Sequence, residues 1–359
     1  MKICVYAICK NEEKFAERWM KSMSEADGIY VLDTGSTDNT VSLLTKLGAH
    51  VKVEQISPWR FDVARNKSLD LVPDDCDVCV CTDLDEVFEK GWRSKLENAW
   101  QKGKHLQANY TYVWNVLPNG KDGTTFMYQK THTRHHFRWI YPVHEVLECD
   151  MNIAENEICH CENIVLRHFP DDTKSRGQYL DLLKLSVAEH PESDRNTHYL
   201  AREFMFAGDY PSAIKYFKKH LKLPSATWKE ERGASLRYIG DCYLYQNKQS
   251  LAKQFYKKSI CESPTTREGY LALAKLLYDQ KNYFDCYIVL KAMLEITTRN
   301  LTYISSPECW DETPYDLLSL CAHYLNMPEE AYKYCSLAVL QNPQDQRLAS
   351  NLQYFRSRL

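Results

Sequence analysis

The sequence has little glycine, no long apolar run and no marked excess of either charge. Only 12 of its 359 residues are glycine, which excludes collagen-like and low-complexity chains. The apolar run near the start, Ile3–Cys9, is soon followed by charged residues and is too short for a membrane span or a signal segment. A formal net charge of −3 argues against a general nucleic-acid binder. These absences favour a globular protein, which we expect to be cytoplasmic.

Cysteine and tyrosine, by contrast, are abundant, with 14 and 24 residues. Without an export signal, we expect the cysteines to be reduced and mostly buried. A zinc site is the alternative at Cys76-Asp77-Val78-Cys79 and at Cys159-His160-Cys161. The first run lacks a second pair of cysteines and the second run is spaced too tightly, so neither pattern favours zinc. The length indicates two domains.

The first hundred residues alternate short apolar runs with helical patterns. We expect strands at 3–9, 28–33, 51–56 and 77–82, with helices at 12–23, 40–47 and 64–71. This alternation predicts βαβ units and a mostly parallel sheet. Residues 105–170 are rich in Thr, Tyr, His and Trp, with turns at Pro118-Asn119-Gly120 and Asp122-Gly123. They predict a mixed, partly antiparallel continuation of the sheet that ends with a strand at 164–168.

From about residue 175 the apolar period becomes helical and repeats. The small anchor residues Ala213, Ala252, Cys286 and Ala331 lie 39, 34 and 45 residues apart. A helix-turn-helix unit of ~34 residues resembles the tetratricopeptide repeat. Two spacings exceed this period, which indicates inserted segments near 226–231 and 300–312. We therefore expect an α/β domain over residues 1–175 and an all-α repeat domain over residues 176–359.

Further small residues in the repeats also have a predicted role. They are Ala201, Gly240 and Ala274. At these positions two helices can approach closely, and the abundant tyrosines are expected at the larger packing positions.

An acidic motif follows the fourth expected strand. In Asp83-Leu84-Asp85, residues two apart on an extended chain share one face, so the two carboxylates project together. Such a pair suits Mg²⁺ or Mn²⁺, which prefer oxygen ligands. In an α/β sheet, ligands bind beyond the carboxyl ends of the strands, which is where this motif lies.

A further acidic residue, Asp33, ends the second expected strand. A carboxylate there can accept hydrogen bonds from a nucleobase or a ribose, and Gly35 lets the backbone approach a ligand closely. The neighbouring Thr37 or Asp38 is expected to cap the helix that follows.

Four motifs occur in an order typical of a known family. They are AICKNEE at 7–13, DTGSTD at 33–38, FDVARN at 61–66 and DLDE at 83–86. Together they resemble the family 2 glycosyltransferases of GT-A fold, which use nucleotide-diphospho sugars. The resemblance covers residues 1–170, and the following repeats resemble a tetratricopeptide tail.

The resemblance implies a role for several residues of the nucleotide-sugar and metal site. Asp33 would bind the base, expected to be uracil, and Arg65 would lie near the nucleotide or its diphosphate. Asp83 would contact the ribose or support the metal, and Asp85 would be a direct ligand of Mn²⁺ or Mg²⁺. Leu84 stands where small residues are commoner in the family, a mild departure because that side chain faces away from the acids.

Two later segments complete the implied site. Leu166-Arg167-His168 looks like the family's late metal-binding histidine, so His168 is a candidate ligand. Pro142-Val143-His144-Glu145 looks like its His-Glu segment on the acceptor side, which makes Glu145 the leading candidate for the general base. Other carboxylates compete with it for that role, namely Asp122, Glu148 and Asp150.

A basic stretch lies between these motifs, with Lys130, His132 and Arg138 among its residues. We expect a loop here, either a mobile one that closes on the donor diphosphate or contacts an acidic acceptor, or a solvated one with no such role.

The resemblance implies a metal-dependent, inverting hexosyltransferase. The donor would be a UDP-sugar or a related nucleotide-sugar, and the acceptor a protein, peptide or glycan. Peptide S-glycosylation and glycosylation of a modified DNA base stay open as alternatives, as does a non-catalytic repeat scaffold. A nucleotidylyltransferase is disfavoured because no glycine-rich loop follows the first strand. The repeats are expected to bind a protein partner or to pair in a homodimer.

Overall fold

The computed structural model describes residues 1–117, 120–171 and 177–359. These residues form two compact units, Met1–Glu189 and His190–Leu359. The turn expected at 118–119 and the domain boundary expected between 175 and 176 lie outside the described residues.

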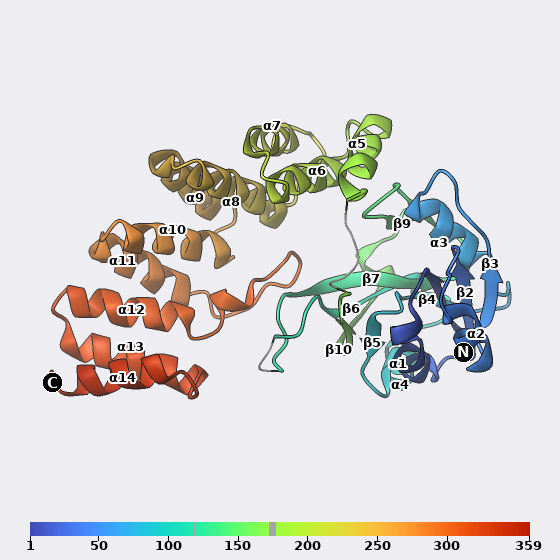
Figure 1. Cartoon of the computed structure of the whole chain (residues 1–359), viewed down its shortest axis with the longest axis horizontal. Coiled ribbons are helices and arrows are strands. Elements are labelled where there is room, and N and C mark those ends of the chain that lie inside the picture. Colours follow the sequence, from blue (N-terminus) through green and yellow to red (C-terminus); the bar gives the residue numbers. More distant parts are fainter. Residues whose placement is uncertain (118–119, 172–176) are drawn as a thin grey trace. The chain divides into compact units, whose positions relative to one another are not determined.

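The first unit is built on an eight-stranded sheet in the order β3-β2-β1-β4-β7-β6-β10-β5 (Figure 1). Strands β3, β2, β1 and β4 are parallel, whereas β7 runs antiparallel to both β4 and β6. Strand β10 pairs in parallel with β6 and antiparallel with β5. In chain order the strands are β1 (Ile3–Cys9), β2 (Gly28–Asp33), β3 (His50–Val53), β4 (Val78–Cys81), β5 (Glu86–Phe88), β6 (Gln107–Val113), β7 (Thr125–Thr133) and β10 (Ile158–His168).

Helices cover both faces of this sheet because its central strands are apolar on both sides. Along β1, residues 3, 5, 7 and 9 pack on α1 (Glu13–Met23) and α4 (Trp92–Ala99). Residues 4, 6 and 8 face the opposite side, which α3 (Phe61–Leu69) covers. The two-residue alternation of a strand therefore assigns each helix to its face.

Smaller elements complete the first unit. Helix α2 (Thr40–Lys46) precedes β3, and β8 (Phe137–Ile140) and β9 (Val146–Cys149) form a separate two-stranded sheet. The short 3₁₀ helix η1 (Glu155–Glu157) leads into β10, and α5 (Tyr179–Glu189) ends the unit. Strand β10 begins at Ile158, earlier than the sequence predicts, and has a bulge between Cys161 and Val165. The predicted mixed α/β sheet is confirmed.

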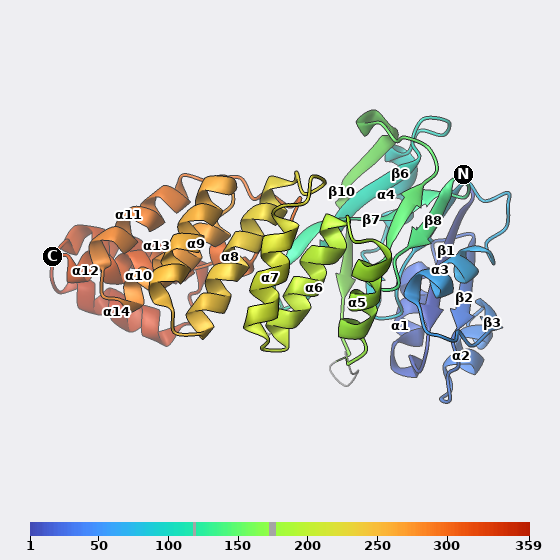
Figure 2. The same cartoon turned by 90° about the horizontal axis from the view of Figure 1, so that it is seen from above.

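The second unit consists of helix pairs that follow one another in sequence order (Figure 2). Its helices are α6 (Asp194–Phe206), α7 (Tyr210–His220), α8 (Lys229–Tyr245), α9 (Gln249–Glu262), α10 (Glu268–Asp279), α11 (Tyr283–Leu294), α12 (Thr313–Tyr324), α13 (Pro328–Gln341) and α14 (Gln346–Arg356). A long connection with the 3₁₀ helix η2 (Pro307–Cys309) separates α11 from α12, close to the insertion predicted from the repeat spacing. Within the described part of the chain, no helix is both long and apolar enough to span a bilayer.

The anchor residues predicted from the repeat period are buried between the paired helices. Ala213, Ala252, Cys286 and Ala331 are each at most 1% exposed. Gly240 of α8 lies where α9 crosses, and a methyl group placed on it would be 2.5 Å from the Tyr256 ring. The predicted tetratricopeptide-like packing is confirmed, and a close helix contact is made at a glycine.

We predict that Gly240→Ala destabilises the repeats. The added carbon would displace Tyr256, whose hydroxyl donates a 2.7 Å hydrogen bond to Asp241. Overpacking of this kind costs about 1–3 kcal/mol. Urea unfolding of the full chain, followed by helical circular dichroism, should show a lower midpoint. Ser250→Ala, an exposed change on α9, should shift stability by less than about 0.5 kcal/mol. Equal midpoints for the two variants would contradict the close-packing argument.

Candidate active site

The acidic residues predicted from the sequence lie at the carboxyl edge of the parallel strands. Asp33 is the last residue of β2, and Asp83 and Asp85 lie in the segment between β4 and β5. Strands β2, β1 and β4 are parallel neighbours, so this edge collects the ends of all three. It is the place where an open α/β sheet binds its ligand.

Arg65 of α3 joins two of the predicted residues. Its guanidinium holds both Asp83 oxygens, with Nη1–Oδ1 at 2.8 Å and Nη2–Oδ2 at 3.1 Å. Its Nε donates a 2.7 Å hydrogen bond to Glu145 Oε1. Only 4% of Arg65 is exposed, and its guanidinium also lies against the Trp139 ring. One buried cation thus links the acidic motif to the segment that precedes β9.

Lys130 of β7 extends this arrangement on the other side of Asp83. Its Nζ lies 3.0 Å from Asp83 Oδ2 and 3.2 Å from Glu86 Oε1. Glu86 in turn accepts hydrogen bonds from the Tyr112 hydroxyl and from the Asp83 backbone N–H. Negative and positive side chains therefore alternate from Glu145 through Arg65, Asp83 and Lys130 to Glu86. We call these five residues the charge chain.

The charge chain keeps its central carboxylate ionised. Burial raises the pKa of Asp83, but Arg65 and Lys130 outweigh this effect and hold the pKa well below its ordinary value. Burial alone would lower the pKa of Lys130, yet Asp83 and Glu86 raise it well above the usual range. Since both Asp83 oxygens already face cations, Asp83 is suited to positioning its neighbours.

The basic stretch predicted as a loop is in fact part of the sheet, so both loop interpretations are wrong for its first residues. Lys130 and His132 lie in β7 and are 3% and 0% exposed. Acidic partners on the neighbouring segment compensate Lys130, and the Tyr6 hydroxyl lies 2.7 Å from His132 Nε2. The basic residues of this segment belong to a strand in which three consecutive residues, Lys130, Thr131 and His132, are buried.

Asp85 and His168 lie beside each other although 83 positions separate them in the sequence. Strand β10 pairs with β5 in a register that places His168 opposite Glu86, and the Phe169 N–H donates to the Asp85 carbonyl. As a result His168 Nε2 lies 3.3 Å from Asp85 Oδ2. Both side chains are largely buried, with 12% and 17% exposed.

The histidine tautomer makes this pair suited to a cation. His168 Nδ1 lies 2.8 Å from the Trp114 carbonyl, which can only accept, so Nδ1 carries the proton. In the neutral ring, the Nε2 lone pair then faces the Asp85 carboxylate. Because both atoms are electron-pair donors, a proton or a metal ion is needed between them. Burial lowers the pKa of His168, but the contact with Asp85 outweighs burial and raises it. Oxygen and imidazole nitrogen together fit Mn²⁺.

Trp114 adds an aromatic surface next to this pair. Its ring centroid lies 4.7 Å from that of His168, and 47% of the residue is exposed. Burying one aromatic face against the histidine leaves the rest of the indole open to a ligand. Nothing in the local sequence pattern singled out this tryptophan.

Asp33 is buried in its own turn. Its Oδ1 accepts hydrogen bonds from the backbone of Gly35 and Ser36 at 2.9 and 2.8 Å, and its Oδ2 accepts from the Cys9 thiol and the Ser36 hydroxyl. The positive φ of Gly35, 108°, allows the chain to wrap around the carboxylate. Direct contact between Asp33 and a base would require some of these bonds to be exchanged.

The other candidate bases lie in different surroundings from Glu145. Only 11% of the Glu145 side chain is exposed, and it belongs to the charge chain. The competing carboxylates are more exposed and bonded to other basic groups: Asp122 to Arg167, Glu148 to Arg138 and Asp150 to His136. The structure thus joins Arg65, Asp83 and Glu145 in one cluster and pairs Asp85 with His168.

Glu86 and Lys130 are the residues whose importance the sequence reasoning missed. The sequence pattern groups Lys130 with its basic neighbours and presents Glu86 only as the end of the DLDE motif. The signal for this ion pair is a strand pattern over 125–133 that places a lysine among buried residues, because a buried lysine requires an acidic partner.

Residues 4–153 match the model of the family described as "Glycosyl transferase family 2". No curated protein matches the chain.

Three solved structures that are similar to the chain share 13–15% sequence identity with it. PilF of Pseudomonas aeruginosa covers 50% of this chain and 72% of its own, with 15% identity and a TM-score of 0.38. The match to MamA covers 47% of this chain and 89% of MamA, with 14% identity and a TM-score of 0.38. YrrB, described as a TPR protein with an unusual peptide-binding site, covers 50% and 83%, with 13% identity and a TM-score of 0.37.

The family match falls on the part of the chain that forms the mixed sheet and its acidic carboxyl edge. The paired helices lie after the matched residues. Residues 4–153 are a family 2 glycosyltransferase domain, and a tetratricopeptide-like helical domain follows it.

Proposed function

We propose that the protein is a metal-dependent, inverting glycosyltransferase that moves a hexose from a UDP-sugar to a protein, peptide or glycan acceptor. The observation that carries this proposal is the Asp85–His168 pair, 3.3 Å apart beside the charge chain in a family 2 domain. A carboxylate oxygen from the segment before β5 and an imidazole nitrogen from the end of β10 converge there, at the edge where an open α/β sheet binds its ligands.

Asp85 and His168 would hold Mn²⁺ or Mg²⁺ in this mechanism. The bound cation would offset the negative charge that develops on the diphosphate leaving group. The Trp114 carbonyl keeps the His168 proton on Nδ1, so that Nε2 stays directed at the metal position. Asp83 acts through Arg65 and Lys130 to fix the backbone that carries Asp85.

The nucleotide would bind along the ends of β2 and β4. Asp33 contributes by holding the turn at 33–36, whose backbone outlines one side of the site. Arg65 would lie near the diphosphate and stay charged there, because burial lowers its pKa but Asp83 and Glu145 outweigh burial and raise it well above the usual range. The exposed ring of Trp114 would support the sugar by stacking.

Glu145 would act as the general base. Its bond to Arg65 fixes the carboxylate in orientation, and one displacement at the anomeric carbon would follow removal of the acceptor proton. The helical repeats would bring a protein or peptide acceptor to this domain, a role suited to stacked helix pairs.

We predict that Asp85→Ala and His168→Ala each weaken Mn²⁺ binding at least tenfold. Each change removes one of the two ligands that converge at the site. Isothermal titration of the chelator-treated chain measures the affinity directly, and release of UDP from a panel of UDP-sugars measures turnover, which should become undetectable in the Asp85 variant.

The matched control is Asp75→Ala, which removes an aspartate whose side chain is 73% exposed and which pairs only with Lys2 among the described residues. Its Mn²⁺ affinity should equal that of the unchanged protein. Normal turnover by the Asp85 variant in the presence of chelator would refute the metal role.

We predict that Glu145→Gln lowers the rate of UDP release at least a hundredfold and leaves donor affinity within about threefold, the pattern of a lost proton acceptor. Glutamine can still accept the hydrogen bond from Arg65, so the fold of the cluster should survive. A thermal-shift screen with Mn²⁺ first identifies a donor that stabilises the chain.

Glu148→Gln provides the comparison, since this exposed glutamate pairs with Arg138 on the β8–β9 hairpin. Its rate should stay within twofold of the original. If the two variants have the same rate, the base lies elsewhere.

A further inference from the structure

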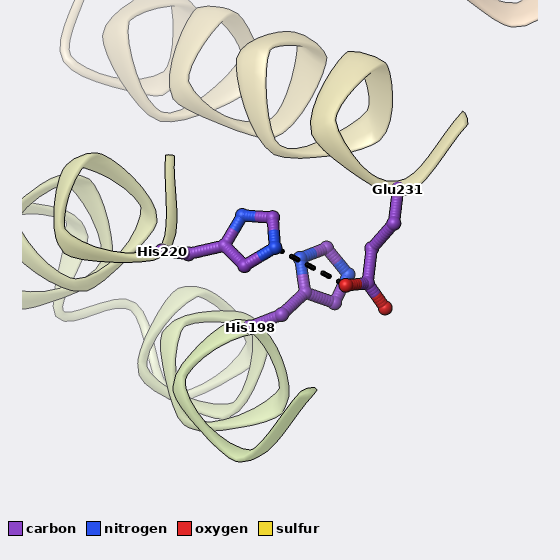
Figure 3. A group of neighbouring side chains, drawn as sticks. All are labelled: His198, His220 and Glu231. Atoms are coloured by element: carbon purple, nitrogen blue, oxygen red, sulfur yellow. Dashed lines mark hydrogen bonds and ion pairs between the residues drawn. The ribbon is translucent and has the colours of Figure 1, made fainter. Parts of the chain in front are cut away.

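A second group of metal-ligating side chains lies within the helical repeats. His198 of α6, His220 at the end of α7 and Glu231 in the first turn of α8 converge from three helices (Figure 3). One ligand atom from each lies within 4.8 Å of the other two. The two histidines are 0% exposed and Glu231 is 4% exposed. Their burial sets them apart from the scattered histidines and carboxylates of a protein surface.

Both imidazole rings are oriented by the same hydroxyl. Ser235 Oγ lies 2.7 Å from His198 Nδ1 and 2.9 Å from His220 Nδ1. When both Nδ1 atoms donate to this oxygen, both Nε2 atoms carry a free lone pair. Metal-binding histidines usually have this arrangement, in which the second nitrogen donates to a fixed acceptor.

Each Nε2 atom faces an oxygen that can share a metal with it. His220 Nε2 lies 3.1 Å from Glu231 Oε1, and His198 Nε2 lies 2.8 Å from the Tyr303 hydroxyl. Two ligands at 2.0–2.2 Å from a tetrahedral zinc ion are about 3.3 Å apart, close to the first of these distances. Tyr303 comes from the connection between α11 and η2, so a fourth donor reaches the cluster from outside the three helices.

We propose that His198, His220 and Glu231 bind Zn²⁺, with the Tyr303 oxygen as the nearest fourth donor. Two imidazoles and one carboxylate form a donor set that zinc accepts in proteins, whereas Mg²⁺ and Ca²⁺ prefer oxygen alone. The nearby Arg202, Arg195 and Arg237 oppose any cation, so the site depends on the strong preference of zinc for imidazole nitrogen. The ion would tie α6, α7 and α8 to the inserted connection.

The competing explanation is a closed chain of hydrogen bonds without metal. Tyr303 would donate to His198, His198 to Ser235, Ser235 to His220 and His220 to the Glu231 carboxylate. This chain satisfies every member as well, so metal binding itself has to be measured.

The experiment uses the full chain carrying Asp85→Ala, which removes the metal ligand proposed for the first unit. After chelator treatment, zinc titration should give one tightly bound equivalent and a higher Tm. Co²⁺ in place of zinc should give the intense visible absorption of a four-coordinate site. Adding His220→Gln should lower zinc affinity at least tenfold and abolish the Tm increase, whereas adding His190→Gln, a change at a half-buried histidine outside the cluster, should have no effect.

Circular dichroism shows whether the His220 variant is folded. If it is not, the cobalt spectrum of the Asp85→Ala chain decides whether the site binds metal. A folded Asp85→Ala chain that takes up no zinc and gives no four-coordinate cobalt spectrum would overturn the proposal in favour of the metal-free chain. Equal zinc binding with and without His220→Gln would also overturn it. Neither result depends on glycosyltransferase activity, so failure here leaves the proposed function untouched.

Discussion

The ion pair between Arg65 and Asp83 is the contact on which the first unit's site depends. Each partner is placed by a different element, Arg65 by α3 and Asp83 by the end of β4, and each would be costly to bury alone. The Arg65 side chain is 5% exposed and 32% of the Asp83 side chain is exposed, so loss of Asp83 would leave the buried guanidinium with Glu145 as its carboxylate partner among the described residues. The pair therefore fixes the helix relative to the strand, and with it the backbone that leads to Asp85. Lys130 and Glu145 extend the same constraint to β7 and to the segment before β9.

The sequence predicted the architecture well because both periodicities were strong. Strands β1 and β2 have the predicted bounds, since each is a continuous apolar run that ends at a polar turn. The repeats are recognisable from their small anchor residues, because two helices can cross closely only where the side chains between them are small. The start of β10 was missed because the bulge after Cys161 interrupts its pattern, and the strand's first residues look like an isolated cysteine motif.

The site was predictable where a motif is local, and less so where the fold assembles it. DLDE is contiguous, whereas the proximity of Asp85 and His168 depends on the register between β5 and β10, which no spacing reveals. Lys130 shows the limit most clearly. Its neighbours in sequence are basic, but its neighbours in space are Asp83 and Glu86. Charge clusters in sequence therefore say little about which charges compensate one another in the folded chain.

The return of Tyr303 to α6 changes how the repeat unit should unfold. In a plain helical array each repeat touches only its neighbours, so its ends can fray while the middle stays folded. Here the connection before α12 contacts His198, 105 residues earlier, and the Trp228 ring at the start of α8. Loss of the first helix pair would also release this connection. The part of the array from α6 to this connection is thereby closed into a loop of contacts, and its repeats should melt together in one cooperative step.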